Sequence, residues 1–160
     1  MKRMLIFLGF CLATLTSSLS AQNGPVKFSV WSVASGDWSD AKTWKPERVP
    51  GAGDRVLVSP RTVVRFDAKA TPVIRLVQVA GTLRVARDRS TELNVALLKV
   101  QAGNRCTERG FVCDFHGVNK EGEPNALPTG EMPTLEVGTL QDPIPKKHTA
   151  RIRLHFIEGM

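Results

Sequence analysis

Short runs rich in valine and leucine recur along the chain about every twenty residues, a period that is typical of solenoid proteins. Residues 56–58, 76–79 and 97–100 form one series, and residues 63–66 and 83–85 form a second series beside it. Two short strands per period predict an all-β fold of short stacked strands, and they favour a right-handed parallel β-helix-like solenoid. An antiparallel β-sandwich is the alternative, because strands that repeat every roughly 8–12 residues give a similar pattern.

Polar and apolar side chains alternate cleanly over residues 150–156. Alternation with a period of two predicts a strand with one apolar and one polar face. The apolar set would face one way and the charged set the other: Ile152, Leu154 and Phe156 against Arg151, Arg153 and His155.

The first residues of the chain have the three-part pattern of a secretory signal peptide. Lys2 and Arg3 precede a nearly unbroken apolar run over residues 4–15, and small polar residues lead to Ala21. That run is shorter than the roughly 20 residues that a membrane-spanning helix needs. We therefore predict a signal peptide over residues 1–21, cleaved on export, and a secreted mature chain, extracellular or periplasmic, without a membrane span.

The chain is basic and short enough for a single domain. It has 160 residues, with Lys+Arg 22 against Asp+Glu 15 and a formal net charge of +7. Basic proteins often bind nucleic acid, but an exported chain with few aromatic residues is not expected to do so. The excess of positive charge suits an acidic extracellular surface instead.

Residues 104–132 interrupt the strand pattern with a stretch rich in glycine and proline. A long irregular segment inside a compact domain is often functional or covalently tied down. Cys106 and Cys113 lie in it, and a cysteine pair in an exported protein predicts a disulfide. Free or intermolecular thiols are one alternative. A zinc site that includes His116 is another, although it lacks a fourth ligand at a standard spacing, so we expect no metal and no cofactor.

Several motifs follow one another in an order that resembles the G-eight domain, an extracellular β-rich family named for its eight glycines. The resemblance covers residues 38–154. The motifs that carry it are Trp38-Ser39 followed by Trp44, Val49-Pro50-Gly51-Ala52-Gly53-Asp54, Gly81-Thr82-Leu83, a strand ending at Gly103, Leu135-Glu136-Val137-Gly138-Thr139 and a final alternating strand.

The resemblance implies a β-rich domain of a secreted or cell-surface protein. Several members of the family are linked to hyaluronan and other polysaccharides, and the domain usually precedes or joins a long parallel β-helix. We divide the chain accordingly into a signal peptide (1–21), a lead-in strand (22–37), the domain (38–156) with its insertion loop (104–132), and a tail (157–160). The insertion loop is a departure from the family pattern, and so is the short stretch of chain after Leu154.

Two groups of residues are candidates for ligand binding. Trp38 and Trp44 could stack on a sugar ring, or could instead cover an open end of the strand stack. Arg65, Arg75 and Arg84 would form a ladder for the carboxylates or sulfates of a glycan if they occupy neighbouring outward positions, and otherwise form a solvated basic face.

A third set of residues is expected to form turns rather than a site, because glycine tolerates positive φ and aspartate caps turns. The set is Pro50, Gly51, Gly53, Asp54, Gly81, Gly103 and Gly138. No catalytic residue is predicted, since the three histidines are scattered and no hydrolase or metalloprotease motif occurs.

Three functions remain open on the sequence. The first is a secreted non-catalytic module that binds polysaccharide, with an acidic glycan as the expected ligand. The second is a structural or protein-interaction module that docks on a β-helical partner through its open end. The third is a small carbohydrate-active enzyme.

Overall fold

The computed structural model describes residues 25–103, 107–108 and 132–158. The predicted signal peptide, the predicted disulfide between Cys106 and Cys113, and most of the predicted insertion loop lie outside the described residues. The disulfide and the signal peptide therefore stay predictions.

The described chain is built from short strands, as the valine-rich runs predict, with one turn of 3₁₀ helix and no α-helix in the described ranges. In chain order the elements are β1 (Val30–Ser32), β2 (Gly36–Asp37), η1 (Ala41–Thr43), β3 (Trp44–Lys45), β4 (Arg55–Val58), β5 (Val63–Phe66), β6 (Ile74–Val79), β7 (Thr82–Val85), β8 (Thr91–Val100), β9 (Thr134–Glu136) and β10 (Ala150–Leu154).

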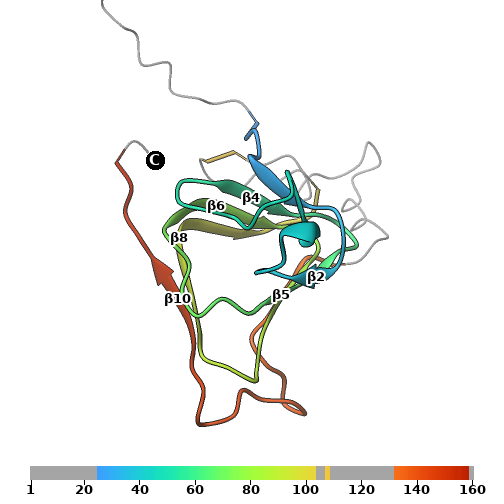
Figure 1. Ribbon diagram of the computed structural model, residues 1–160, viewed down its shortest axis with the longest axis vertical. Coiled ribbons are helices and arrows are strands. Elements are labelled where there is room, and N and C mark those ends of the chain that lie inside the picture. The colour runs from blue at the N-terminus through green and yellow to red at the C-terminus, as the bar shows by residue number, and fades with distance from the viewer. Residues whose placement is uncertain (1–24, 104–106, 109–131, 159–160) are drawn as a thin grey trace, which may run out of the picture.

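The strands form two sheets that face each other (Figure 1). Sheet A has the order β10-β8-β6-β4-β1-β3, and sheet B has the order β2-β5-β7-β9. From β4 onward the chain alternates between the two sheets, so each new pair of strands lies beside the previous pair. The two strand series predicted from the sequence therefore become the two sheets.

Pairing within the sheets is parallel, apart from the contact of β3 with β1. The all-β prediction is confirmed. The alternative of an antiparallel sandwich is wrong for the described strands. The sequence alone could not separate the solenoid from the sandwich, because side chains alternate with a period of two in both parallel and antiparallel strands.

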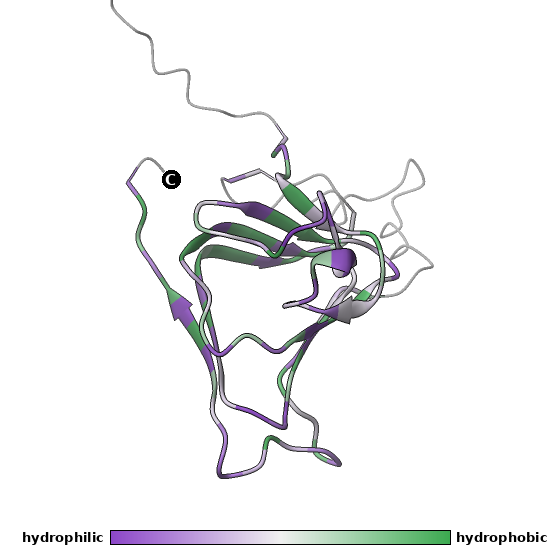
Figure 2. Ribbon diagram, viewed as in Figure 1, coloured by the Kyte–Doolittle hydropathy of each residue, from purple (hydrophilic) through white to green (hydrophobic). Residues whose placement is uncertain are grey.

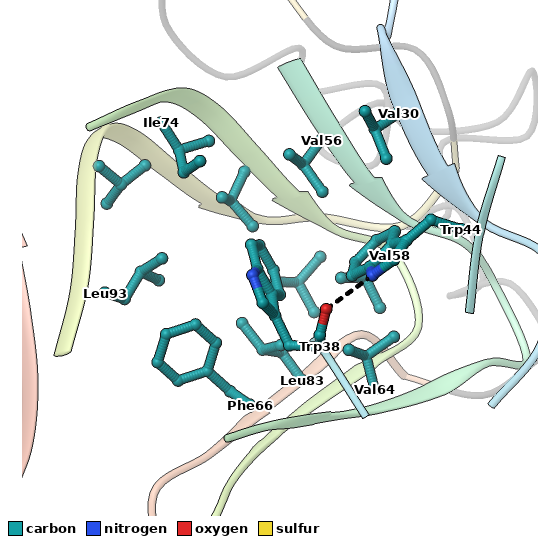
Figure 3. Close-up of a cluster of buried hydrophobic side chains, with 13 residues drawn as sticks. Val30, Trp38, Trp44, Val56, Val58, Val64, Phe66, Ile74, Leu83 and Leu93 are labelled. Carbon is teal, nitrogen blue, oxygen red and sulfur yellow. Dashed lines mark hydrogen bonds between the residues drawn. The ribbon is translucent and has the colours of Figure 1, made fainter. Parts of the chain in front are cut away.

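The core lies between the sheets and consists of the inward side chains of both (Figure 3). Val56, Val77 and Leu83 are each at most 1% exposed. Trp38 and Trp44 lie at one end of this core, with ring centroids 5.0 Å apart in an edge-to-face arrangement, and Phe66 packs against Trp38. The indole Nε1 of Trp44 donates to the carbonyl oxygen of Trp38 at 2.9 Å.

The tryptophans cover the end of the stack that contains β2 and β3. Trp44 belongs to β3, at one edge of sheet A, and Trp38 directly follows β2, at the corresponding edge of sheet B. The 3₁₀ turn η1 lies between them in sequence, and the Asp40 carboxylate caps it by accepting from the Lys42 backbone N–H at 2.9 Å. This end of the core is therefore covered.

The turn residues are held by specific contacts. Asp54 is buried and accepts from both Nη1 and Nη2 of Arg48, at 2.6 and 2.8 Å, and from the Gly51 N–H at 2.6 Å. Ser29 Oγ donates a fourth bond to it at 2.8 Å. Gly81 leaves no room for a Cβ atom, which would lie 2.2 Å from the Ser59 carbonyl oxygen.

Three further glycines of the turn set have left-handed backbones. Gly53, Gly103 and Gly138 have φ of 74°, 78° and 71°. Pro50 is buried beside the Asp54 turn.

Candidate interaction site

The end of the stack that contains β9 and β10 lies opposite the tryptophans, and no described segment of the chain covers it. β10 is the edge strand of sheet A and β9 is the edge strand of sheet B. In Figure 1, β10 lies at the outer edge of its sheet (red). The side of β10 that faces away from β8 has no neighbouring strand in the described part of the chain. A free strand edge presents backbone N–H and C=O groups that can pair with another strand.

An apolar cavity of about 150 Å³ lies between the two sheets at this end. Its lining includes Phe66, Leu83 and Leu93 from the core and Leu135, Val137 and Ile152 from the last strands. A dry apolar cavity of roughly 150 Å³ can hold a benzene-sized group. The cavity could therefore receive one large apolar side chain.

Apolar side chains at the cavity and along the chain after it are exposed. Ile152, Leu154 and Phe156 are 38%, 70% and 90% exposed. Figure 2 shows apolar and polar stretches alternating along this part of the chain, as the sequence predicts. In β4, β6 and β8 the matching inward positions are covered by a neighbouring layer, so the exposure of these residues reflects the end of the stack.

A mostly buried polar ladder links the segment before β6 to β8 and to the residue after β10. The Asn94 N–H donates to Thr71 Oγ1, and Asn94 Nδ2 donates to the Thr71 carbonyl oxygen, both at 2.9 Å. Asn94 Oδ1 lies 2.8 Å from Nε2 of His155, the residue after the end of β10. Thr71, Asn94 and His155 thus supply one rung each beside β6, β8 and β10. We call this the Thr71–Asn94–His155 ladder.

Charged side chains of β8 and β10 form ion pairs on the outer face of sheet A. Glu92 of β8 accepts from Arg151 Nη1 at 2.8 Å, and Arg153 Nε lies 3.4 Å from its other oxygen. The hydrogen bond from Arg151 lowers the pKa of Glu92, and Arg153 contributes to the same direction. Two guanidinium groups on the edge strand therefore share one carboxylate.

The predicted arginine ladder is only partly assembled. Arg65 and Arg84 are directly aligned on β5 and β7 of sheet B, so these two lie side by side. Each has acidic partners: Arg65 pairs with Asp37 and Asp88, at 3.3 and 2.6 Å, and Arg84 pairs with Glu136 at 2.9 Å. A glycan carboxylate would have to displace these partners.

Arg75 lies on sheet A and is not part of that ladder. With Arg55 it holds Glu108, whose carboxylate lies 2.6 Å from Arg75 Nη2 and 2.7 Å from Arg55 Nε. Hydrogen bonds from Arg75, and then from Arg55, lower the pKa of Glu108 to about 2. The Lys99 ammonium donates to the carbonyl oxygen of Thr107, beside Glu108. These contacts fasten the described part of the predicted insertion loop to sheet A.

Trp38 and Trp44 are both 1% exposed. Their rings pack against each other, Phe66 and the valines of the core (Figure 3). No ring face is left for a sugar, so the structure favours the interpretation that they cover an end of the stack.

The sequence pattern identified β10 as an amphipathic strand but missed that its apolar face lies at the open end. The order of the runs could have indicated this position, because residues 150–156 follow all the other runs that form sheet A. Among the described residues, no three His, Cys, Asp or Glu side chains gather as metal ligands would, and no helix is long and apolar enough to cross a membrane.

The molecule is thus an all-β domain of stacked parallel strands with one covered and one open end. Comparison with protein families agrees with this class: the G8 domain matches residues 43–158. The chain belongs to the G8 domain family, which confirms the resemblance to the G-eight domain.

Comparison with curated proteins finds fibrocystin in two mammals. Mouse (Mus musculus) fibrocystin is 39% identical over 90 residues, which are 54% of this chain and 2% of that protein. Dog (Canis lupus familiaris) fibrocystin is 26% identical over 150 residues, which are 92% of this chain and 3% of that protein. The chain therefore spans only a few per cent of the length of these relatives. No solved structure matches the chain.

Proposed function

We propose that this domain is a non-catalytic interaction module that docks on a β-helical protein partner through its open end. The observation that carries the proposal is the asymmetry of the stack. Tryptophans and η1 cover the core at one end, whereas β9 and β10 leave an apolar cavity and a free strand edge at the other. A soluble domain rarely exposes such a surface without a partner for it.

The energetics favour a partner strand at this end. Covering Leu154 and Phe156 would stabilise a complex by roughly 1.5–3 kcal/mol for each side chain. A strand added to β10 would also satisfy its outward backbone groups, and a side chain in the cavity would fix the strand along the edge.

We further propose that the two sheets form a short right-handed parallel β-solenoid. The alternation of the chain between sheets A and B from β4 to β10 supports this, because each alternation corresponds to one coil. A partner built from parallel β-coils would then continue the same stack.

The test uses a fluorescent peptide with the sequence of β8, Thr91–Val100, because this strand already pairs in parallel with β10 inside the domain. We expect saturable binding by fluorescence anisotropy, and at least a tenfold loss for Leu154→Lys, since a charge would enter an apolar contact. Val33→Lys is the matched control, because Val33 is 54% exposed at the covered end. Binding that is lost equally in both variants, or absent from the unmodified domain, would overturn the proposal.

Polysaccharide binding is the second candidate, and one observation favours it. Lys42 and Lys45 flank an open hollow of about 410 Å³ whose lining also includes Val33, Trp44, Pro46 and one carboxylate, that of Glu47. The two ammonium groups could pair with the carboxylate of an acidic sugar, and the exposed Val33 supplies apolar surface beside them. A glycan array tests this, and signal on uronic-acid glycans that disappears in Lys42→Glu/Lys45→Glu would support it. The absence of any glycan signal at millimolar concentration would contradict it.

We propose, finally, that the domain acts outside the cell. Membership in the G8 domain family and the signal-peptide pattern of residues 1–21 support this location. N-terminal sequencing of protein recovered from the medium should begin near Gln22, and retention of the full N-terminus inside the producing cell would contradict the proposal.

A further inference from the structure

We propose that the strand that docks on β10 is recognised at two polar positions, carrying a carboxylate opposite Arg153 and a hydrogen-bonding side chain opposite His155. The inference rests on the proposed function, because it specifies the partner of the same open end. The partner is a parallel β-coil of another polypeptide.

The charge of the edge strand supports the first position. Among the described residues, Arg151 and Arg153 share the single carboxylate of Glu92, which leaves one positive charge more than negative charge on the outer face of β10. Arg55 and Arg75 on β4 and β6 share Glu108 in the same way, but both of those strands have neighbours on each side, whereas the pair on β10 lies on an edge strand that an incoming strand can reach. Opposite charges on adjacent strands stabilise their pairing. A carboxylate on the incoming strand would restore the balance.

The Thr71–Asn94–His155 ladder supports the second position. Each of its rungs is bonded to the rung below, and His155 uses Nε2 to contact Asn94. Within the described part of the chain, Nδ1 of the His155 ring has no hydrogen-bond partner. The side chain of His155 is only partly exposed, so a new strand would bury it further. A Ser, Thr or Asn side chain on that strand would supply the next rung.

A second copy of this domain fits the open end poorly. A head-to-tail copy would offer β3, which has two residues against the five of β10. Two copies related by a twofold axis would pair β10 with β10 in antiparallel fashion and bring the arginines of both strands together. Like charges opposite one another destabilise strand pairing.

The experiment uses the β8 peptide, because it carries Glu92 and Asn94 at outward positions two residues apart. Fluorescence anisotropy measures its affinity for the unmodified domain, for Arg153→Glu and for the control Lys69→Glu, which changes an exposed lysine elsewhere. We expect Arg153→Glu to weaken binding roughly fivefold, and a peptide with Glu92→Lys to recover that loss. Lys69→Glu should leave both affinities within about twofold.

A double-mutant cycle between the peptide and the domain tests the Thr71–Asn94–His155 ladder. The peptide with Asn94→Leu and the domain with His155→Leu should each weaken binding, and the combined loss should be smaller than the product of the two. Circular dichroism of each variant verifies folding before titration.

The outcomes separate this inference from the proposed function. Binding that depends on Leu154 but shows neither charge recovery nor coupling at His155 overturns the two polar positions and leaves the docking surface standing. Failure of every peptide to bind overturns both. A concentration-dependent dimer of the domain alone in sedimentation, lost in Leu154→Lys, would make the occupant a second copy and would overturn the partner proposed here.

Discussion

At the scale of single residues, Asp54 shows why a turn motif that looks like loop sequence is fixed in space. Four donors surround its carboxylate, and the hydrogen bonds from Arg48 are the main cause that lowers its pKa to about 2. The motif joins the Ser29 segment to the start of β4, so it anchors the first strands of the stack.

We predict that Asp54→Asn lowers the free energy of unfolding at pH 7 by about 2 kcal/mol, because the folded state loses a carboxylate that it stabilises. The folded-state pKa lies below that of the unfolded chain. The stabilisation is therefore complete above about pH 4 and is lost as the pH falls from about 4 to about 2. Urea unfolding at a series of pH values measures both effects.

The control for this prediction is Glu47→Gln, which changes an exposed carboxylate nearby. Its unfolding curve should follow that of the unmodified domain at every pH. Equal losses in the two variants would contradict the role given to Asp54.

Gly81 gives a second prediction at this scale. Its missing Cβ atom would lie 2.2 Å from the Ser59 carbonyl oxygen and 2.5 Å from that of Thr62, and both are backbone atoms that cannot move aside easily. We expect Gly81→Ala to cost roughly 2 kcal/mol or more in thermal or urea unfolding. Gly51→Ala is the matched control, since its Cβ atom would have only an ordinary contact at 3.7 Å, and an equal cost there would argue against the steric explanation.

At the scale of elements, Glu108 ties residues 107–108 to β4 and β6. The carboxylate is half-enclosed by Arg55 and Arg75, and its loss would leave two arginines on adjacent strands without their shared partner. We predict that Glu108→Gln lowers the free energy of unfolding by roughly 1–2 kcal/mol, and that the loss shrinks as the pH falls from about 4.5 to about 2.

Glu158→Gln, an exposed carboxylate at the other end of the described chain, is the control for Glu108 and should have no measurable effect. A loss for Glu108→Gln that persists unchanged at pH 2 would mean that the ion pair is not its cause.

Strand positions could be predicted from the sequence because each run is rich in valine and leucine and is bounded by turn residues. The runs at residues 56–58, 63–66 and 83–85 all lie in strands of the structure. Sequence could not decide which arginines would meet. Arg65 and Arg84 became neighbours and Arg75 did not, because strand register and sheet membership depend on the course of the whole chain.

The two tryptophans are a second case that the sequence alone could not decide. An indole suits a sugar ring and a hydrophobic core equally well, so residue type alone left both roles open. Only the position of Trp38 and Trp44 at the covered end of the stack separates them.

At the scale of the whole molecule, the two ends of the stack differ, so that only one of them offers a surface on which further strands could stack. One end has a cluster of aromatic side chains and a two-residue edge strand. The other has an apolar cavity, a five-residue edge strand and the last rung of a polar ladder. A stack that is closed at one end and open at the other can begin a longer assembly, but it cannot polymerise freely by itself.

Hydrogen–deuterium exchange of the domain with and without the β8 peptide tests docking at the open end, because it locates the contact on the chain. We predict slower exchange over Ala150–Leu154 when the peptide is bound, with no change over Trp44–Lys45 at the covered end. Protection at the covered end, or saturable binding that leaves the exchange of β10 unchanged, would contradict it.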